Sequence, residues 1–511
     1  MTVRAMARVL FAAVLAAMVC AVPARAERGD TKRGKAIYLK RCLGCHGVEG
    51  DGLGPAAQRL NPPPRDFTSG QYKFKSSAFN EDVPNDADLF RMIRDGMPGT
   101  SMPGWRDVLS EQAIWDVIAY IKVFGELEEK PKHQVDFGTQ VKSSPASIKK
   151  GKSLFLKDDR CSECHGKNGK GDGVKKLKDD NGARTWPRNL TKPWTFRAGN
   201  SPKEIFTRIT AGIPGTQMPS FANPKSKKKL SIMDRWHIAN YVASLGKSVE
   251  VVQAKNTVVG ASKLDGKLPD RPDDPRWSQA PPSTFFLVPQ IIAKPRFFTP
   301  SNDTITVRAF YTDQALVLLL EWDDRTRSVP GDPDSAKIAD KPMGPDAVAV
   351  QLPVKIPTGM EKPYFAMGNA AKPVNLWYWK VGTAKQPQSV QALIGRGLGK
   401  LTKRDTAAQK LVGRGVYKDG TWKVIIRRSL KTGDAANDIQ LQAGRFIPVA
   451  FAAWDGSNGE IGAKHTMTTW YWLLLKPSGG GSRPLLIAIL VAFVLAGFLV
   501  WWSRTAAKRR S

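Results

Sequence analysis

The feature that most constrains this chain is a five-residue motif that occurs twice, as CLGCH over 42–46 and as CSECH over 161–165. In each copy two residues separate two cysteines and a histidine follows at once; these residues are Cys42, Cys45 and His46, then Cys161, Cys164 and His165. The spacing lets two thiols add to the two vinyl groups of one porphyrin while the histidine reaches the iron. A zinc knuckle or a redox dithiol would explain a lone Cys-x-x-Cys, but the repeated histidine favours two covalent haem c groups.

The remaining cysteine lies in an amino-terminal segment that is typical of a secretory signal. Two arginines precede an apolar run over 9–22, and small residues at 24–26 form a cleavage site. We therefore expect a signal peptide over 1–26 and no spare thiol in the mature chain. Lipid modification of Cys20 is the alternative, although Val19 is larger than the small residue that such processing usually needs.

An uncharged apolar segment over 485–502 follows a polar, glycine-rich stretch and precedes a cluster of basic residues. This pattern predicts a single transmembrane helix whose end lies in the cytoplasm. Together with the signal, it predicts a protein of the inner membrane with its body in the periplasm. The formal net charge of +32 would suggest nucleic acid as a partner inside the cytosol, but export removes that possibility.

The two motif-bearing segments are copies of one domain. After each motif the same short sequences recur in the same order, at 50–52, 64–68 and 95–103, then at 171–173, 187–191 and 211–219. A helix closes each copy, since apolar residues recur on one face after Ser110 and the pattern ends at Gly125. We place the two domains at 27–130 and 145–250.

These features resemble class I cytochrome c, a small all-α fold. The resemblance implies that a histidine and a methionine bind each iron, the pairs being His46 with Met102 and His165 with Met218. The repeat favours Met102 over Met97, because Ile213 replaces Met97 in the second copy. Core packing is the alternative role for the methionines. Arg65 and Arg188 are either partners of haem propionates or ordinary surface residues.

An iron that holds both a histidine and a methionine has no open position for a substrate, and the thioether raises its reduction potential. We therefore expect electron transfer and no catalytic residue. A peroxidase would need one methionine displaced, which the repeated Met-Pro sequence argues against.

From about residue 270 the helical pattern gives way to short strand-like runs at 304–311, 315–322, 346–354, 421–426 and 446–453. They predict an antiparallel, all-β sandwich over 270–476. Several short sequences here resemble the haem-b-binding domain of the ethylbenzene dehydrogenase gamma subunit; they lie at 274–277, 367–369, 374–380 and 449–462.

The resemblance implies a third, non-covalent haem b whose iron is bound by a methionine and a lysine. Met367 best matches the methionine, and Lys464 is the lysine that we favour. A neutral lysine ligand requires a dry pocket beside a metal. His465 is the alternative ligand, and a sandwich without haem, with Met367 in its core, is the third possibility.

The sequence thus predicts a multidomain, membrane-anchored periplasmic cytochrome with two all-α domains, an all-β sandwich and a transmembrane helix. Related gamma subunits serve molybdenum enzymes of the dimethyl sulfoxide reductase type. We therefore expect an electron-transfer subunit that links a molybdenum catalytic subunit and an iron-sulfur subunit to the respiratory chain. A wire between a quinol-oxidising complex and a terminal oxidase is one alternative, and a redox sensor with a haem-free, ligand-binding sandwich is the other.

Overall fold

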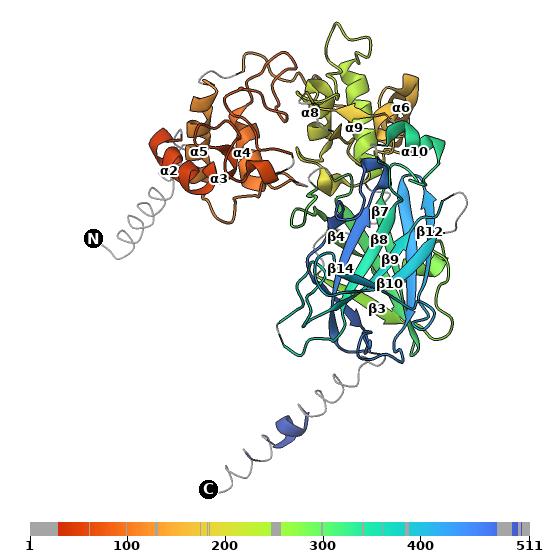
Figure 1. Ribbon diagram of the computed structural model, residues 1–511. Helices are drawn as coiled ribbons and strands as arrows, with labels where there is room; N and C mark the ends of the chain where they lie inside the picture. The colour runs from red at the N-terminus through yellow and green to blue at the C-terminus, as the bar shows by residue number, and fades with distance from the viewer. Residues whose placement is uncertain are drawn as a thin grey trace, which may run out of the picture.

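The structure is a computed structural model that describes residues 29–477 together with 493–498 and 502. Within the first range, the description leaves out 61, 99, 128–130, 174, 181, 183, 247–256, 298–299, 340–341, 360 and 384–387. The described chain forms two helical domains that lie side by side and a large β-sandwich below the second of them (Figure 1).

The two helical domains repeat one arrangement of four helices. In the first domain these are α2 (Thr31–Arg41), α3 (Leu43–His46), α4 (Asp86–Asp95) and α5 (Glu111–Phe124), with the short 3-10 helix η1 (Ala57–Arg59). In the second they are α6 (Pro145–Leu156), α7 (Ser162–His165), α8 (Pro202–Ala211) and α9 (Ile232–Leu245), with η2 (Lys157–Asp159) and η3 (Pro193–Thr195). Each cysteine motif therefore lies on a short second helix, and the expected internal repeat is confirmed.

The closing helices begin where the sequence predicts. The Ser110 hydroxyl accepts a hydrogen bond from the Ala113 N–H at 3.2 Å, and Ser231 caps α9 in the same way through the Asp234 N–H. Apolar residues on the inner face of α5, with Ile114 and Ile118 almost fully buried, pack against the rest of the first domain.

One glycine in each helical domain lets the first helix cross the closing helix at very short range. A Cβ atom on Gly34 of α2 would lie 1.9 Å from the carbonyl oxygen of Asp116 on α5. A Cβ atom on Gly151 of α6 would lie 2.0 Å from the carbonyl oxygen of His237 on α9. Only glycine permits these crossings, which position the motif helices that follow α2 and α6.

The β-domain consists of β3 to β16, with strands at Val258–Lys263, Ser283–Phe286, Val288–Pro289, Thr304–Tyr311, Ala315–Asp323, Ala347–Pro353, Val374–Lys380, Ser389–Gly395, Leu401–Arg404, Val412–Lys418, Thr421–Ser429, Phe446–Trp454, Thr466–Met467 and Tyr471–Leu475. The short helices η4 (Pro275–Gln279), α10 (Pro333–Ile338) and η5 (Gly456–Asn458) lie between them. The strand order is β11-β10-β9-β8-β14-β16-β3-β6-β7-β13-β12, so β14 joins the two halves. Apolar side chains from both halves fill the core, among them Trp322, Trp377, Trp379 and Trp422.

The predicted fold class needs three corrections. The sandwich begins at β3 (Val258–Lys263), earlier than residue 270, and is not purely antiparallel, because β3 pairs in parallel with β6 and β16. The second helical domain is not all-α, because β1 (Leu177–Lys178) pairs with β2 (Arg184–Thr185). The sequence of β3 contains a glycine and polar residues, and its apolar and polar residues alternate too little to distinguish a strand from a linker.

The predicted transmembrane helix is the third correction. Within the part of the chain that the structure describes, no helix is long and apolar enough to cross a bilayer. Of the segment 485–502, the structure describes only 493–498 and 502. The rest of that segment and the predicted signal over 1–26 lie outside the described residues.

Candidate haem sites

The histidine of each motif is held by one backbone carbonyl. Nδ1 of His46 lies 3.1 Å from the carbonyl oxygen of Arg65, and Nδ1 of His165 lies 3.0 Å from that of Arg188. Burial lowers the pKa of both imidazoles, which favours neutral rings with the proton on Nδ1. This hydrogen bond leaves Nε2 of each ring free to bind iron.

The loops that carry the predicted methionine ligands have the same backbone geometry in both domains. The Met102 N–H donates to Thr100 Oγ1, and the Met218 N–H donates to Thr216 Oγ1, each at 3.2 Å. The carbonyl oxygen of Met102 accepts from the N–H of Met97 at 3.0 Å, as that of Met218 accepts from Ile213 at 3.1 Å. Met102 packs against the apolar core that also contacts Cys42.

A cavity of about 650 Å³ brings the second set of predicted ligands together. Its wall includes all four of them: Cys161, Cys164, His165 and Met218. The volume lies within the range of about 300–1,000 Å³ that is typical of cofactor pockets. The second motif, its histidine and the repeated methionine thus surround one space that fits a haem.

Both other domains also reach this cavity. Pro62, Lys73 and Phe74 of the first helical domain line it, and so do residues 300–303 and 323–325 of the sandwich. The Arg188 guanidinium donates to the Asp303 carboxylate of the sandwich at 2.8 Å. The backbone carbonyl oxygen of the same arginine lies within hydrogen-bond distance of His165 Nδ1. The second haem site therefore lies where the three domains meet.

Two sets of contacts fix these domains around the cavity. The Arg197 side chain, which lines it, donates through Nε to the carbonyl oxygen of Pro98 in the methionine loop of the first domain, at 3.2 Å. On the other side, Asn189 Nδ2 donates to Asp323 of the sandwich, and Lys192 forms an ion pair with the same carboxylate, both at 2.7 Å.

Met367 occupies an unusual backbone position in the sandwich. It has a φ of 66°, in the left-handed region, where a non-glycine residue is strained. Its N–H donates to Gln351 Oε1 at 3.2 Å, and its carbonyl oxygen accepts from the Gly397 N–H at 2.9 Å. These two bonds hold a half-buried methionine side chain at the end of β8.

Lys464 and His465 lie in the turn before β15. Lys464 is half-buried, and among the described residues no hydrogen bond or ion pair engages its Nζ. His465 is buried, its Nδ1 lies 3.1 Å from the carbonyl oxygen of Gly462, and its ring centroid lies 4.6 Å from that of Trp454. Burial lowers the pKa of His465 to about 4.

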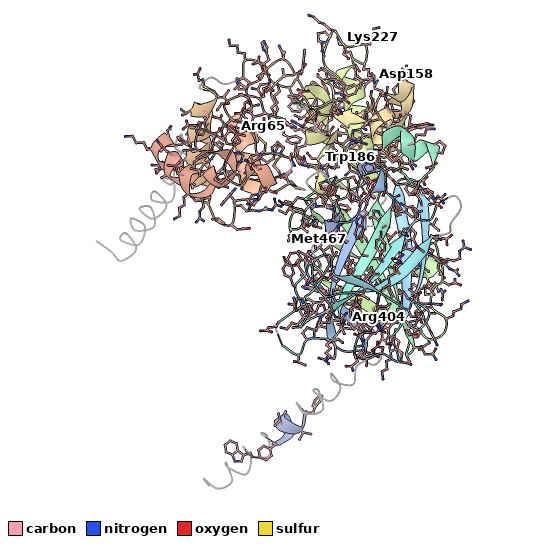
Figure 2. All side chains as sticks on the ribbon, in the orientation of Figure 1. Arg65, Asp158, Trp186, Lys227, Arg404 and Met467 are labelled. Atoms are coloured by element: carbon pink, nitrogen blue, oxygen red, sulfur yellow. The ribbon has the colours of Figure 1, made fainter. Side chains whose placement is uncertain are left out.

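Between these two positions the outer face of the sandwich carries an apolar patch. It consists of small and aromatic side chains of β8, β9 and β14, namely Ala347, Ala349, Ala452, Tyr378 and Trp454. Met467 pairs with Ala452 and lies on the same face, near the junction with the helical domains (Figure 2). Ala347, Ala349 and Trp454 of this patch are buried, with exposed fractions of 0%, 3% and 9%.

Buried carboxylates occupy the end of the sandwich beside the second helical domain. Asp324, Asp346 and Asp455 offer oxygens that all lie within 4.8 Å of one another, and Glu460 is fully buried nearby. Burial, reinforced by the neighbouring carboxylates, raises the pKa of Asp324 and Glu460 well above the usual range. Asp346 accepts hydrogen bonds from the N–H groups of Ser328 and Gly456 and from the Trp422 indole, so it links two loops to strand β13.

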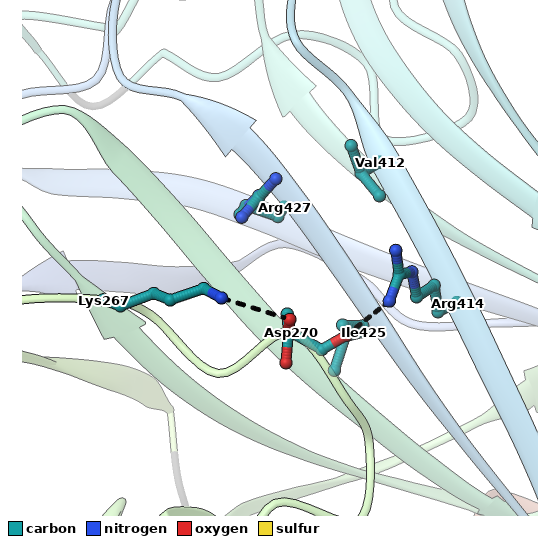
Figure 3. A pocket seen from close by; sticks show the side chains of 6 residues that line it. All are labelled: Lys267, Asp270, Val412, Arg414, Ile425 and Arg427. Atoms are coloured by element: carbon teal, nitrogen blue, oxygen red, sulfur yellow. Dashed lines mark hydrogen bonds and ion pairs between the residues drawn. The ribbon is translucent and has the colours of Figure 1, made fainter.

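A second, smaller cavity of about 190 Å³ lies on the sandwich (Figure 3). Arg414 reaches the carbonyl oxygen of Asp270 at 3.5 Å, and Lys267 forms an ion pair with the Asp270 carboxylate at 3.6 Å. None of the predicted ligands lines this cavity.

Comparison with known families matches each of the three domains. Residues 29–121 match the family of cbb3-type cytochrome c oxidase subunit III, and residues 148–246 match cytochrome c. Residues 274–396 and 393–466 match the ethylbenzene dehydrogenase family. The chain joins two cytochrome c domains to an ethylbenzene dehydrogenase-type domain. It accordingly carries two covalent haem c groups and one haem b.

Three relatives resemble the chain over less than half of its length. A protein of Haloferax mediterranei assigned as a respiratory nitrate reductase haem subunit is 26% identical over 47% of this chain and 80% of its own. The gamma subunit of dimethylsulfide dehydrogenase from Rhodovulum sulfidophilum is 27% identical over 45% of this chain and 85% of its own. The gamma subunit of chlorate reductase from Ideonella dechloratans is 27% identical over 34% of this chain and 66% of its own.

Three residues at the second haem site were missed by the sequence analysis. Trp186 of the cytochrome c domain, and Asn302 and Arg325 of the ethylbenzene dehydrogenase-type domain, all line the cavity. Trp186 could have been noticed, because it precedes the Pro-Arg pair of the repeat, where the first copy has Pro63. No sequence signal connects the other two to a haem that is attached more than a hundred residues earlier.

Proposed function

We propose that this chain relays electrons between a molybdenum oxidoreductase and the respiratory chain, through two haem c groups and one haem b. The observation that carries the proposal is the position of the second haem c cavity, which residues of all three domains line. Electrons that pass between the first cytochrome c domain and the ethylbenzene dehydrogenase-type domain then have an intermediate site. The named subunits of nitrate reductase, dimethylsulfide dehydrogenase and chlorate reductase support a partner of this class.

In this proposal His46 and Met102 bind the iron of the first haem, and His165 and Met218 bind that of the second. The bound haems supply reversible one-electron chemistry. The protein side chains hold the rings, exclude water from the iron and leave no position for a substrate.

We further propose that haem b lies against the alanine-rich patch, between Met367 and Lys464. At one end of the patch, the hydrogen bond from the Met367 N–H to Gln351 fixes Met367 to β8. At the other end, Trp454 pairs with Ala347 of β8 and stacks on His465, which follows Lys464. Positions 347 and 351 of β8 are separated by about 13 Å at 3.3 Å per residue. The half-buried Lys464 amine without a protein partner and the strained Met367 backbone support these two ligands.

The haem b ligands are tested by substitution in the full chain. Met367→Ala and Lys464→Ala should each lower the amount of acid-acetone-extractable haem from one per chain while both covalent haems stay. The exposed Lys355 provides a matched control, since Lys355→Ala should retain all three haems. Loss of haem b in His465→Ala with full retention in Lys464→Ala would show that the histidine is the ligand.

The partner is tested by isolating the tagged chain from its own cells under mild conditions. We expect it to copurify with a molybdenum-containing subunit and an iron-sulfur subunit, measured by metal analysis. Copurification with quinol-oxidising or oxidase subunits and no molybdenum would overturn this part of the proposal.

We also propose that the haem domains work in the periplasm, because the sequence predicts a signal over 1–26. Fractionation of cells should find the haem-bearing chain outside the cytoplasm. A cytoplasmic holoprotein would refute this placement.

A further inference from the structure

Arg325 of the ethylbenzene dehydrogenase-type domain enters the second cytochrome c domain. Its Nε donates to the carbonyl oxygen of Gly171 at 2.8 Å, and its guanidinium carbon lies 3.7 Å from the ring centroid of Trp186. Figure 2 shows Trp186 at the junction of the two domains. The side chain also lines the haem cavity, so one domain contributes a cation to the haem pocket of another.

Several buried polar groups in this pocket find no partner within the described protein. The indole Nε1 of Trp186 is one, and Nε and Nη1 of Arg208 are others. Asn302, only 3% exposed, leaves both Oδ1 and Nδ2 unsatisfied. A buried donor without an acceptor costs about 1–3 kcal/mol, so unpaired donors gathered around one cavity indicate a group that accepts from them.

The charges around the cavity point to the same kind of group. Arg184 and Arg325 both lie over the Trp186 ring. Arg188, whose guanidinium pairs with Asp303, is close enough for its charge to oppose that of Arg325. These arginines are half-buried, and clustered guanidinium groups repel one another less when an anion lies among them. A haem brings two carboxylates, its propionates, which are the planar acceptors that guanidinium groups bind best.

We infer that Arg325 and Asn302 of the ethylbenzene dehydrogenase-type domain bind the propionates of the second haem c, so that this haem is held by two domains. Trp186 contributes its indole N–H to the same carboxylates. The hydrogen bond to the Gly171 carbonyl oxygen and the stacking on the Trp186 ring hold the Arg325 guanidinium in place. This mode of haem binding does not depend on the identity of the partner enzyme.

The first cytochrome c domain lacks this arrangement at the equivalent position. In the first cytochrome c domain Pro63 stands at the position of Trp186, and it has no indole to donate. Arg325 should therefore set the potential of the second haem and leave that of the first unchanged. Because a cation beside a haem favours the reduced iron, removing it should lower the potential.

The test is an optical redox titration of the full holoprotein. The transition of the first haem is identified as the one that Met102→His displaces. Arg325→Gln should move the other covalent-haem transition to lower potential, and Arg325→Lys, which keeps the charge, should restore most of the shift. Arg414→Gln is the control, since Arg414 is an exposed arginine on β12 of the same domain.

Asn302→Leu is a milder second variant, which removes the amide but no charge, and it should shift the same transition by a smaller amount. All variants are first checked for three haems per chain. If neither Arg325→Gln nor Asn302→Leu moves the transition of the second haem, the inference is wrong. A shift of both covalent haems by equal amounts, or an equal shift in Arg414→Gln, would also overturn it.

Discussion

The close crossing of α2 and α5 in the first cytochrome c domain predicts that Gly34→Ala forces these two helices apart and lowers the stability of the domain. The added Cβ would lie 1.9 Å from the carbonyl oxygen of Asp116 and 2.6 Å from its carbonyl carbon. Ordinary contact begins at 3.4 Å, so α2 and α5 would have to separate by about 1.5 Å at this point. Neither atom belongs to a side chain that can rotate away.

The cost follows from two opposing effects. Overpacking a tight contact costs about 1–3 kcal/mol, and a backbone obstacle places this case at about 3 kcal/mol. Alanine is better than glycine inside a helix by about 1 kcal/mol. The net loss is therefore about 2 kcal/mol, which is about a 30-fold increase in the open population of the domain.

Gly44 on α3 provides the control within the same domain. A Cβ atom there meets nothing within 4 Å, so Gly44→Ala should be neutral or stabilise its helix by up to about 1 kcal/mol. Hydrogen exchange followed by mass spectrometry measures the opening of α2 and α5 separately from the other domains. Equal protection of these helices in Gly34→Ala and Gly44→Ala would refute the reasoning.

Two further predictions concern the irons and the buried carboxylates. Met102→Ala and Met218→Ala should each let carbon monoxide bind one covalent haem and lower its potential, whereas Met97→Ala should do neither; equal sensitivity at Met97 would show that the repeat had been misaligned. Burial raises the folded-state pKa of Asp346 to about 7 from about 3.9 in the unfolded chain, so its contribution to stability is complete below pH 4 and is lost as the pH rises toward 7. Urea unfolding of the sandwich should show this decline, and Asp346→Asn should flatten it; an unchanged pH profile would contradict the assignment.

The sequence by itself determined the local features. The cysteine motifs, the repeat around them, and the cap at Ser110 depend on residues that are close in the chain, and the structure has the repeat and the cap where they were predicted. The predicted strand 304–311 is β6 (Thr304–Tyr311), because its alternation is local as well. The choice of Met102 and Met218 as ligands stays a prediction, although both lie in loops of equal geometry.

Only the tertiary structure decided which domains share the second haem pocket. Arg325 follows β7 and reads in the sequence as one of many basic residues, yet the packing of the sandwich against the second cytochrome c domain brings it to 3.7 Å from Trp186. Likewise, the parallel pairing of β3 joins segments that lie far apart in the chain. The physical reason is the same in both cases: burial, pairing and electrostatic contact between distant segments depend on the completed fold, and local periodicity contains no information about them.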